Sequence, residues 1–252
     1  MSQSKTLKRF QRQHSSKILW GDSFSELFLL RFGLLDSLQQ LDKDSHVLDY
    51  GAGTGRLTTF LVNKGFKVTN LEPTQSISLV KNRVTESEFC EITLVSDSES
   101  LVPKSFDAVV SIGVIHHVSN PEDLMDDMLR LCKEGGIVSV WVYRRQNIFL
   151  QNIIEISRIA LRRAPHAVLL FFSSLFSTVL YLQSLLVRNQ SLGLEQYTLR
   201  NLNLMVYDQL SPPLSTYFRT HELIELLLPI GLPFVITEVG SGINITIRKI
   251  LL

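Results

Sequence analysis

The chain has 252 residues, a formal net charge of +1, 45% hydrophobic residues and two cysteines. This length suits one large α/β domain, and no Pro/Gly/Ser-rich linker divides it. The basic residues form no long run, which argues against nucleic acid as the main partner. Cys90 and Cys132 lie far apart without C-x-x-C spacing, and His116 and His117 are adjacent. We therefore expect neither a disulfide framework nor a metal site.

The N-terminal segment from Met1 to Lys17 is polar and lacks the apolar stretch of a secretory signal. We expect it to be a frayed arm. From Asp22 onward, apolar residues at helical spacing predict an amphipathic helix that leads to the first strand: Phe24, Leu27, Phe28, Leu34, Leu35 and Leu38. Packing is its favoured role, and partial cover of a binding cleft is the alternative.

A glycine-rich turn follows the first predicted strand, which covers His46 to Tyr50. The turn is Gly51-Ala52-Gly53-Thr54-Gly55, and a predicted helix runs from Leu57 to Lys64. Glycines at every second position have no Cβ atoms that would keep a ligand away from the backbone. The start of the following helix has free N–H groups and the positive end of the helix dipole. These features predict a nucleotide-like ligand. The dinucleotide fingerprint needs its third glycine one position later, where this chain has Arg56, so NAD is disfavoured.

Acidic residues follow the next two predicted strands. Phe66 to Leu71 is a predicted strand that ends at Glu72, and an acid at this position accepts hydrogen bonds from ribose hydroxyls. An ordinary exposed loop position is the alternative for Glu72. Asp97 follows the predicted strand Ile92 to Ser96. The near-continuous apolar run from Phe106 to Ile112 then predicts a buried parallel strand.

The run D-x-G-x-G-x-G that begins at Asp49 resembles the first motif of class I S-adenosylmethionine-dependent methyltransferases. The resemblance extends from Val47 to Tyr143 and is strongest to the small-molecule branch that includes ubiquinone and menaquinone biosynthesis methyltransferases. It implies S-adenosylmethionine as the cofactor and places Asp97 near the adenine amino group, with turn capping as the alternative. The implied cofactor-binding residues are Asp49, Gly51, Gly53, Gly55, Glu72, Asp97 and Ser111.

The predicted fold is a single doubly wound, Rossmann-like α/β domain with a seven-stranded, mostly parallel sheet. A helical insert follows strand five, Gly136 to Tyr143, and an antiparallel C-terminal hairpin covers Phe234 to Val239 and Ile243 to Ile250. Within one domain over residues 1–252 we expect an N-terminal helical arm (1–45), a cofactor-binding core (46–143), a helical lid or insert (144–206) and a C-terminal helix and hairpin (207–252).

The insert contains an apolar stretch from Ala167 to Val187 without a formal charge, long enough to be a transmembrane candidate. A single span would separate the C-terminal strands from their sheet, and serines at helical spacing form a mild polar stripe. We therefore favour a lid or oligomer contact. A helix lying on the membrane is the second reading, in which Arg158, Arg162 and Arg163 would suit anionic headgroups. The expected location is cytoplasmic, with peripheral membrane contact through residues 167–187 as the alternative.

Methyl transfer to a hydroxyl or an activated ring carbon benefits from a base, and His is best matched to neutral pH. His116 and His117 follow strand four, at the edge where open α/β sheets bind ligands. His117 is the candidate catalytic residue, with a packed position at a helix start as the alternative. Candidate acceptor-pocket residues are Tyr143, Tyr207, Asp208, Arg219 and His221, of which the last two could instead begin a helix.

These features predict a methyltransferase for a small-molecule or lipid-like acceptor, with O- and C-methylation both open. One alternative is a nicotinamide dinucleotide oxidoreductase, and another is a non-catalytic cofactor-binding or membrane-associated interaction protein. The sequence leaves the acceptor and the oligomeric state open.

Overall fold

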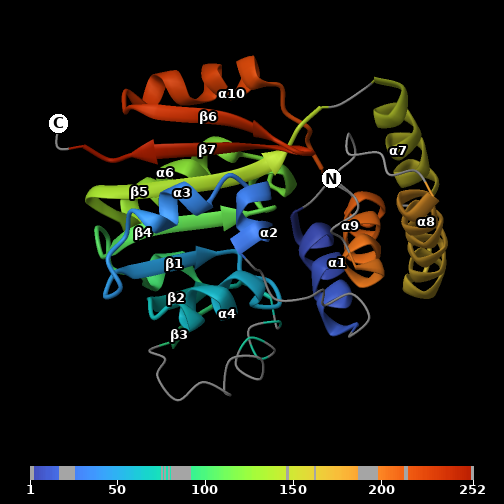
Figure 1. The fold of residues 1–252 in the computed structure, drawn as a ribbon, viewed down its shortest axis with the longest axis horizontal. Helices are drawn as coiled ribbons and strands as arrows, with labels where there is room; N and C mark the ends of the chain where they lie inside the picture. Colours follow the sequence, from blue (N-terminus) through green and yellow to red (C-terminus); the bar gives the residue numbers. More distant parts are fainter. Residues whose placement is uncertain are drawn as a thin grey trace. The chain divides into compact units, whose positions relative to one another are not determined.

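The computed structural model describes residues 3–16, 26–74, 76, 78, 80, 92–145, 148–161, 163–186, 198–212 and 215–250. The chain forms two compact units (Figure 1). The helical unit consists of residues 1–22 and 146–215, and the sheet unit of residues 23–145 and 216–252. This division differs from the predicted single domain, because the predicted arm (1–45) is split at residue 22 and the insert extends to residue 215. Cys90 lies outside the described residues.

The sheet unit is built on one sheet with the strand order β3-β2-β1-β4-β5-β7-β6. The parallel strands are β1 (His46–Tyr50), β2 (Lys67–Leu71), β3 (Ile92–Val95), β4 (Phe106–Ile112) and β5 (Cys132–Tyr143). β7 (Gly242–Arg248) pairs antiparallel with β5, and β6 (Phe234–Val239) pairs antiparallel with β7. The predicted α/β Rossmann-like fold is confirmed. The strand order reverses between β1 and β4, where sheets of this kind bind their ligands.

Helices cover both faces of this sheet. One face carries α2 (Glu26–Arg31), α3 (Leu35–Gln39) and α4 (Arg56–Asn63), and the other carries α6 (Pro121–Leu131) and α10 (Thr220–Leu227). Single 3-10 turns, η2 (Ser98–Ser100), η3 (Ile115–His117) and η6 (Leu228–Ile230), lie in the connections. Pro121 starts α6 and two acids occupy its first turn, which suits the missing N–H of proline and the positive end of the helix dipole.

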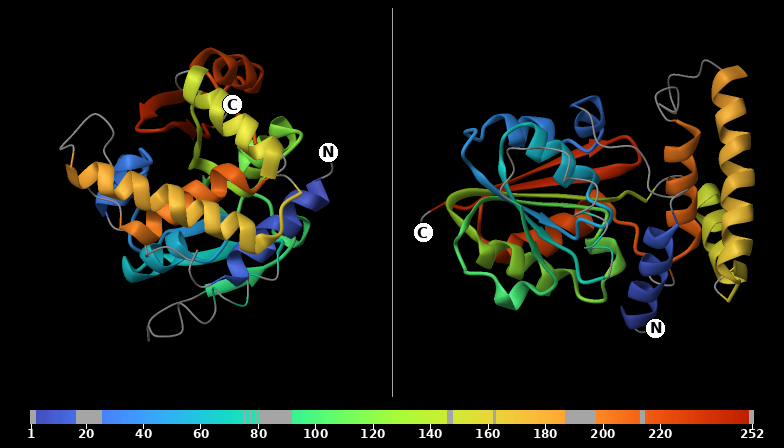
Figure 2. Two further views of the ribbon diagram at one scale, coloured as in Figure 1. Left: turned by 90° about the vertical axis from the view of Figure 1, so that its right-hand side faces the viewer. Right: turned by 90° about the horizontal axis from the view of Figure 1, so that it is seen from below.

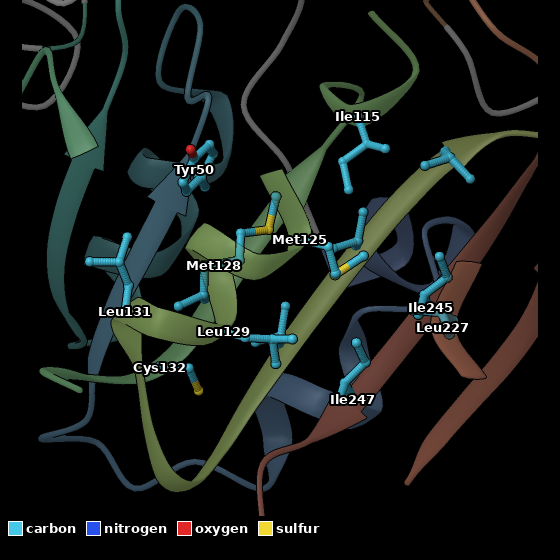
Figure 3. Close-up of a cluster of buried hydrophobic side chains, with 14 of the residues drawn as sticks. Tyr50, Ile115, Met125, Met128, Leu129, Leu131, Cys132, Leu227, Ile245 and Ile247 are labelled. Carbon is cyan, nitrogen blue, oxygen red and sulfur yellow. The ribbon is translucent and has the colours of Figure 1, made fainter. Parts of the chain in front are cut away.

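The alternation of side chains along the strands divides the core into two layers. Val47 packs in the layer with α4, whereas its neighbour Leu48 packs in the layer with α6 and α10. Figure 3 shows part of this second layer, in which Met125 and Met128 from α6 share one cluster with Ile245 from β7. Strands buried on both faces are continuous apolar runs, which explains why β4 could be predicted with its observed bounds.

The single amphipathic helix predicted from Asp22 is wrong, because the chain forms two short helices, α2 and α3, with a turn between them. Gly33 in that turn has a φ of 64°, and a Cβ atom there would lie 2.9 Å from Cβ of Asn244 on β7. Only glycine fits this backbone conformation in contact with the sheet. The apolar spacing continues across the turn, so periodicity alone could not reveal the break.

The helical unit contains α1 (Gln3–Ser15), α7 (Ile148–Leu161), α8 (His166–Leu186) and α9 (Leu199–Leu210), and α8 lies along α9 (Figure 2). The prediction of a frayed N-terminal arm is wrong for residues 3–15. Arg9 donates to the carbonyl of Ala164 (3.2 Å), and Gln13 donates to the Asp208 carboxylate (2.8 Å). Polar contacts hold this helix, which explains why a search for apolar patterns missed it.

The core of the helical unit is small and centres on Leu169, Tyr207 and Leu210. Within the part of the chain that the structure describes, the stretch His166–Gln183 is long and apolar enough to cross a membrane, judged by length and composition. Only 17% of that stretch is buried. It therefore differs from the core helix of a globular domain, which is buried over most of its length.

Candidate functional site

The glycine-rich turn lies between the carboxyl end of β1 and the start of α4. Gly51, Gly53 and Gly55 all have positive φ angles, of 79°, 56° and 75°. A Cβ atom would lie 2.4 Å from Val114 at Gly51 and 2.9 Å from Val80 at Gly55. The turn therefore needs glycine for its backbone conformation and for its packing. It brings bare backbone to the carboxyl edge of the sheet, as a cradle for a nucleoside-type ligand requires.

Glu72 lies at the end of β2, is 4% exposed, and is hydrogen bonded to the glycine-rich turn. The backbone N–H of Gly53 donates to one carboxylate oxygen (2.7 Å), and the N–H of Thr74 donates to the other (3.0 Å). One carboxylate thus joins the turn after β1 to the turn after β2. The predicted contact with a ribose stays a prediction, and the structure adds that Glu72 also fixes the position of the glycine turn.

Asp49 lies inside the sheet unit, beneath the turn. Its carboxylate accepts a hydrogen bond from the Thr58 hydroxyl on α4 (2.6 Å), and Asn70 on β2 donates to the same hydroxyl (2.8 Å). Burial raises the pKa of Asp49 to about 7, although the Thr58 hydrogen bond acts in the opposite direction. This chain of contacts connects β1, α4 and β2, so Asp49 supports the turn from within. Its predicted contact with the cofactor stays a prediction.

Asp97 is exposed at the end of β3, where its carboxylate accepts the backbone N–H of Glu99 (3.0 Å) and caps η2. The turn is held from α6, because Arg130 donates to the carbonyl of Ser98 (3.1 Å) and to the Asp127 carboxylate (2.6 Å). Asp127 in turn accepts the hydroxyl of Tyr50, the last residue of β1 (2.9 Å). The capping role is thus present, and contact with an adenine stays a prediction.

Ser111 is fully buried near the end of β4 and donates to the carbonyl of Tyr50 (2.9 Å). This contact ties β4 to β1 at the point where the strand order reverses. Its predicted cofactor contact stays a prediction.

His116 and His117 lie in η3 directly after β4, and both rings are buried. The backbone N–H of Tyr143 donates to Nδ1 of His116 (3.4 Å), and the His116 carbonyl accepts the N–H of Thr216 (2.8 Å). The two histidine ring centroids are 4.2 Å apart. His116 therefore holds β5 and the segment before α10 together. The ring of His117 lies 6.3 Å from that of Tyr143, and its role as a base stays a prediction.

Tyr143 belongs to an aromatic cluster at the carboxyl ends of β4 and β5. Its ring centroid lies 4.1 Å from that of His116, 5.3 Å from that of Trp141 and 5.7 Å from that of Tyr217, on which it is stacked. Sequence analysis did not single out Trp141 or Tyr217. Trp141 belongs to an ordinary apolar strand pattern, and Tyr217 has no motif around it. Only the fold brings residue 217 back to the end of β5, through the backbone hydrogen bonds of its neighbour Phe218.

Arg219 and His221 lie at the start of α10, in the sheet unit. The N–H of Arg219 donates to the Glu222 carboxylate (2.7 Å), which caps the helix, and the Thr220 hydroxyl donates to Glu238 (2.6 Å). The hydrogen bond from Thr220 and the ion pair with Arg144 lower the pKa of Glu238. The alternative of a helix start is therefore present, and an acceptor contact stays a prediction for both residues.

Tyr207 and Asp208 lie on α9 in the helical unit, so the structure does not group them with the residues above. The buried Tyr207 hydroxyl is hydrogen bonded to Nδ1 of His166 (2.7 Å), and Asp208 accepts from Gln13. Both side chains hold helices of their own unit together. Their role in an acceptor pocket stays a prediction.

Within the described residues, no group of three or more His, Cys, Asp or Glu side chains could hold a metal ion. The functional groups of the sheet unit are instead a glycine turn with a carboxylate hydrogen bonded to it, an exposed acid after β3, and two buried histidines after β4. The carboxylates can accept hydrogen bonds from the ribose and the nucleobase of a nucleoside. The histidines offer a ring nitrogen that can accept a proton.

Comparison with known proteins shows which families this arrangement is similar to. Residues 48–140 match the model of the methyltransferase domain family. The chain is 31% identical over 140 residues to a ubiquinone biosynthesis O-methyltransferase of Paracidovorax citrulli. The aligned region covers 51% of this chain and 56% of that protein. It is 29% identical over 105 residues to a demethylmenaquinone methyltransferase of Tropheryma whipplei, covering 41% and 44%. The chain thus spans about half the length of the curated relatives that it matches.

Solved structures show the same fold at low sequence identity. The complex of DhpI with S-adenosylhomocysteine has a TM-score of 0.58 at 14% identity, covering 99% of this chain and 98% of that one. A 1,6-didemethyltoxoflavin-N1-methyltransferase of Burkholderia thailandensis has a TM-score of 0.53 at 17% identity, covering 90% and 79%.

The fold and the glycine turn define a Rossmann-like domain that binds a nucleoside-type ligand at the carboxyl edge of its sheet. Residues 48–140 are similar to the methyltransferase domain family, and the fold is that of solved S-adenosylmethionine-dependent methyltransferases.

Proposed function

We propose that this chain binds S-adenosylmethionine at the glycine turn and transfers its methyl group to a small-molecule or lipid-like acceptor. The observation that carries the proposal is the contact between Gly53 and Glu72. It places a buried carboxylate against a glycine-lined turn, at the strand end where a ribose is held in folds of this type. The family match and the curated relatives, all methyltransferases, favour this reading over a nicotinamide oxidoreductase.

Each of these residues of the sheet unit would have a separate role in binding the cofactor. Gly51, Gly53 and Gly55 leave space for the cofactor, and Glu72 would accept hydrogen bonds from its ribose. Asp97 would lie near the adenine, at the end of β3. When bound, the cofactor supplies a methyl group on a sulfonium, which is already activated for displacement. The protein then has to align the acceptor with that methyl group and exclude water.

His117 is the proposed base. Its ring is buried beside the aromatic cluster that includes Tyr143. In this position it would take the proton from an acceptor hydroxyl or activated ring carbon as the new bond to carbon forms. The aromatic side chains around it suit an acceptor with a flat or apolar part. Two curated relatives, the ubiquinone biosynthesis O-methyltransferase and the demethylmenaquinone methyltransferase, have names that concern quinones, and these names favour an acceptor of that kind.

A transfer assay tests the proposal. Purified protein is incubated with a cell extract and S-adenosylmethionine that carries a labelled methyl group, and the labelled product is isolated. We expect label in an organic-soluble small molecule, with no label in a parallel assay of the Gly53→Val variant, which should not bind the cofactor. Product analysis then shows whether oxygen or carbon was methylated. A protein that binds S-adenosylhomocysteine but labels nothing above that variant would instead be a non-catalytic cofactor-binding protein.

A further inference from the structure

Helix α8 in the helical unit has serines on its packed face and apolar residues on its exposed face. Ser173 and Ser177 are fully buried, as is Leu169, and these three residues lie one turn apart on one face. Asn203 of α9 donates to the Ser174 hydroxyl (3.2 Å), so α9 contacts this polar side of the helix. Ser173 and Ser177, which suggested a polar surface in the sequence, therefore belong to the packed side of α8.

The opposite face of α8 is exposed and apolar. Phe171 is 64% exposed, and four further apolar side chains on the same side of the helix are also exposed: Val168, Leu175, Val179 and Leu182. At 1.5 Å per residue, this stripe extends over roughly 20 Å. The preceding helix α7 adds three exposed isoleucines: Ile153, Ile156 and Ile159. An exposed apolar stripe such as that of α8 marks a contact with a partner or a membrane.

The charges around α8 indicate which occupant fits. In the sequence, Arg162 and Arg163 precede the helix and Arg188 follows it, and no acidic residue lies between Glu155 and Glu195. Two copies of α8 packed face to face about a twofold axis would place arginines near arginines in either orientation, because both ends are basic. An anionic lipid surface complements the apolar stripe and the basic ends together.

We propose that the exposed face of α8 binds the surface of an anionic lipid bilayer, with the helix lying in the plane of the interface. A spanning orientation fits less well. α8 packs along α9, which carries Asn201, Asn203 and Asp208, and a span that kept this packing would place those side chains in the hydrocarbon core. If the proposed methyl transfer also holds, on which this step rests, the acceptor is a molecule that resides in the membrane.

Vesicle co-sedimentation tests the proposal with the full chain. The probes are phosphatidylcholine vesicles, with and without phosphatidylglycerol. The test variant carries Phe171→Ser, Leu175→Ser and Val179→Ser. The control variant carries Val102→Ser and Val235→Ser, which change side chains of the sheet unit that are 70% and 63% exposed. We expect the wild type to bind anionic vesicles more tightly than neutral ones, and the test variant to bind at least about tenfold more weakly. The control variant should bind like the wild type.

Three outcomes would overturn the proposal. The first is a wild type that does not sediment with vesicles, and the second is an equal loss in test and control variants. The third is that the wild type binds no vesicles and forms a dimer by light scattering, whereas the test variant is a monomer. The exposed face of α8 would then contact a second copy of the chain. Bound protein should be released by alkaline carbonate, whereas release by detergent alone would indicate a span. S-adenosylhomocysteine affinity, measured on the same samples, reports on the cofactor site separately.

Discussion

The Glu72 carboxylate and the backbone N–H of Gly53 are joined by a hydrogen bond of 2.7 Å that links the ends of β2 and β1. This contact means that a ligand in the glycine turn would meet a carboxylate that is already held in place. Preorganisation of this kind reduces the cost of ordering the site on binding.

Glu72→Ala should weaken the affinity for S-adenosylhomocysteine by about tenfold or more. Hydrogen bonds to an ionised group are worth roughly 1.5 to 3 kcal/mol, and about 1.4 kcal/mol corresponds to a factor of ten. Titration calorimetry measures the change. Glu134→Ala is the matched control, because that carboxylate pairs with Lys104 at the opposite, amino end of β5. A loss below about twofold for Glu72→Ala would show that this acid has no part in binding.

Asp49→Asn should flatten the dependence of stability on pH. The folded-state pKa of about 7 lies above the ordinary value of 3.8, so the folded protein binds the proton more tightly than the unfolded chain. The stability from this carboxyl is fully present below pH 3.8 and is lost as the pH rises to about 7. Urea unfolding at about pH 4 and about pH 8 measures the difference.

In that comparison the wild type should lose stability between the two pH values by more than Asp49→Asn does, because asparagine resembles the protonated acid. Asp36→Asn, at an exposed acid on α3, is the control and should behave like the wild type. Equal slopes for all three proteins would show that folding does not raise the pKa of Asp49.

His117→Ala and His116→Ala should have different effects. His117→Ala should lower turnover by about 10² at neutral pH with nearly unchanged S-adenosylhomocysteine affinity, as expected for loss of a general base. His116→Ala should lower the free energy of unfolding by roughly 2 to 3 kcal/mol, because a fully buried ring packed on Tyr143 is removed. Turnover is measured on the acceptor identified by the labelling assay. If the His117→Ala protein has full turnover and a lower melting temperature, His117 is a packing residue and not the base.

Arg130→Met should reduce recognition of the adenine. Arg130 holds the turn after β3 through the carbonyl of Ser98, and that turn carries Asp97. We expect S-adenosylhomocysteine to bind roughly threefold to tenfold more weakly, the range of a lost hydrogen bond. The affinity for the analogue with hypoxanthine in place of adenine should fall less. The ratio of the two affinities, which measures the preference for adenine, should therefore decrease. Lys133→Met, which breaks an ion pair with Asp107, is the control. An unchanged preference for adenine would show that Arg130 has no effect on the cofactor site.

The sequence predicted the cofactor half of the fold well, for two physical reasons. Strands buried on both faces have apolar runs with clear ends, so β4 has the predicted bounds. The glycine turn is a local feature, and its positive φ angles and close packing explain why glycine occurs there. Neither feature depends on contacts with distant parts of the chain.

The features that sequence analysis missed depend on tertiary contacts. Gly33 breaks a regular apolar pattern because a Cβ atom at this position would clash with Asn244, which is far away in the sequence. α1 is held by polar contacts to Ala164 and Asp208. Tyr217 joins the aromatic cluster only because the chain returns to the end of β5. The orientation of α8 also needed the structure, because the sequence shows a polar stripe and an apolar stripe without showing which one is packed.

The most direct test of the central claim is calorimetric titration of the purified chain with S-adenosylhomocysteine and, separately, with NAD. We expect saturable binding of S-adenosylhomocysteine by the wild type, none by Gly53→Val, and no binding of NAD. Gly65→Val is the matched control, because Gly65 also has a positive φ, of 90°, but has open space where a Cβ would lie. It should bind like the wild type. A folded Gly53→Val protein that binds S-adenosylhomocysteine as tightly as the wild type, or a wild type that binds NAD instead, would contradict the account.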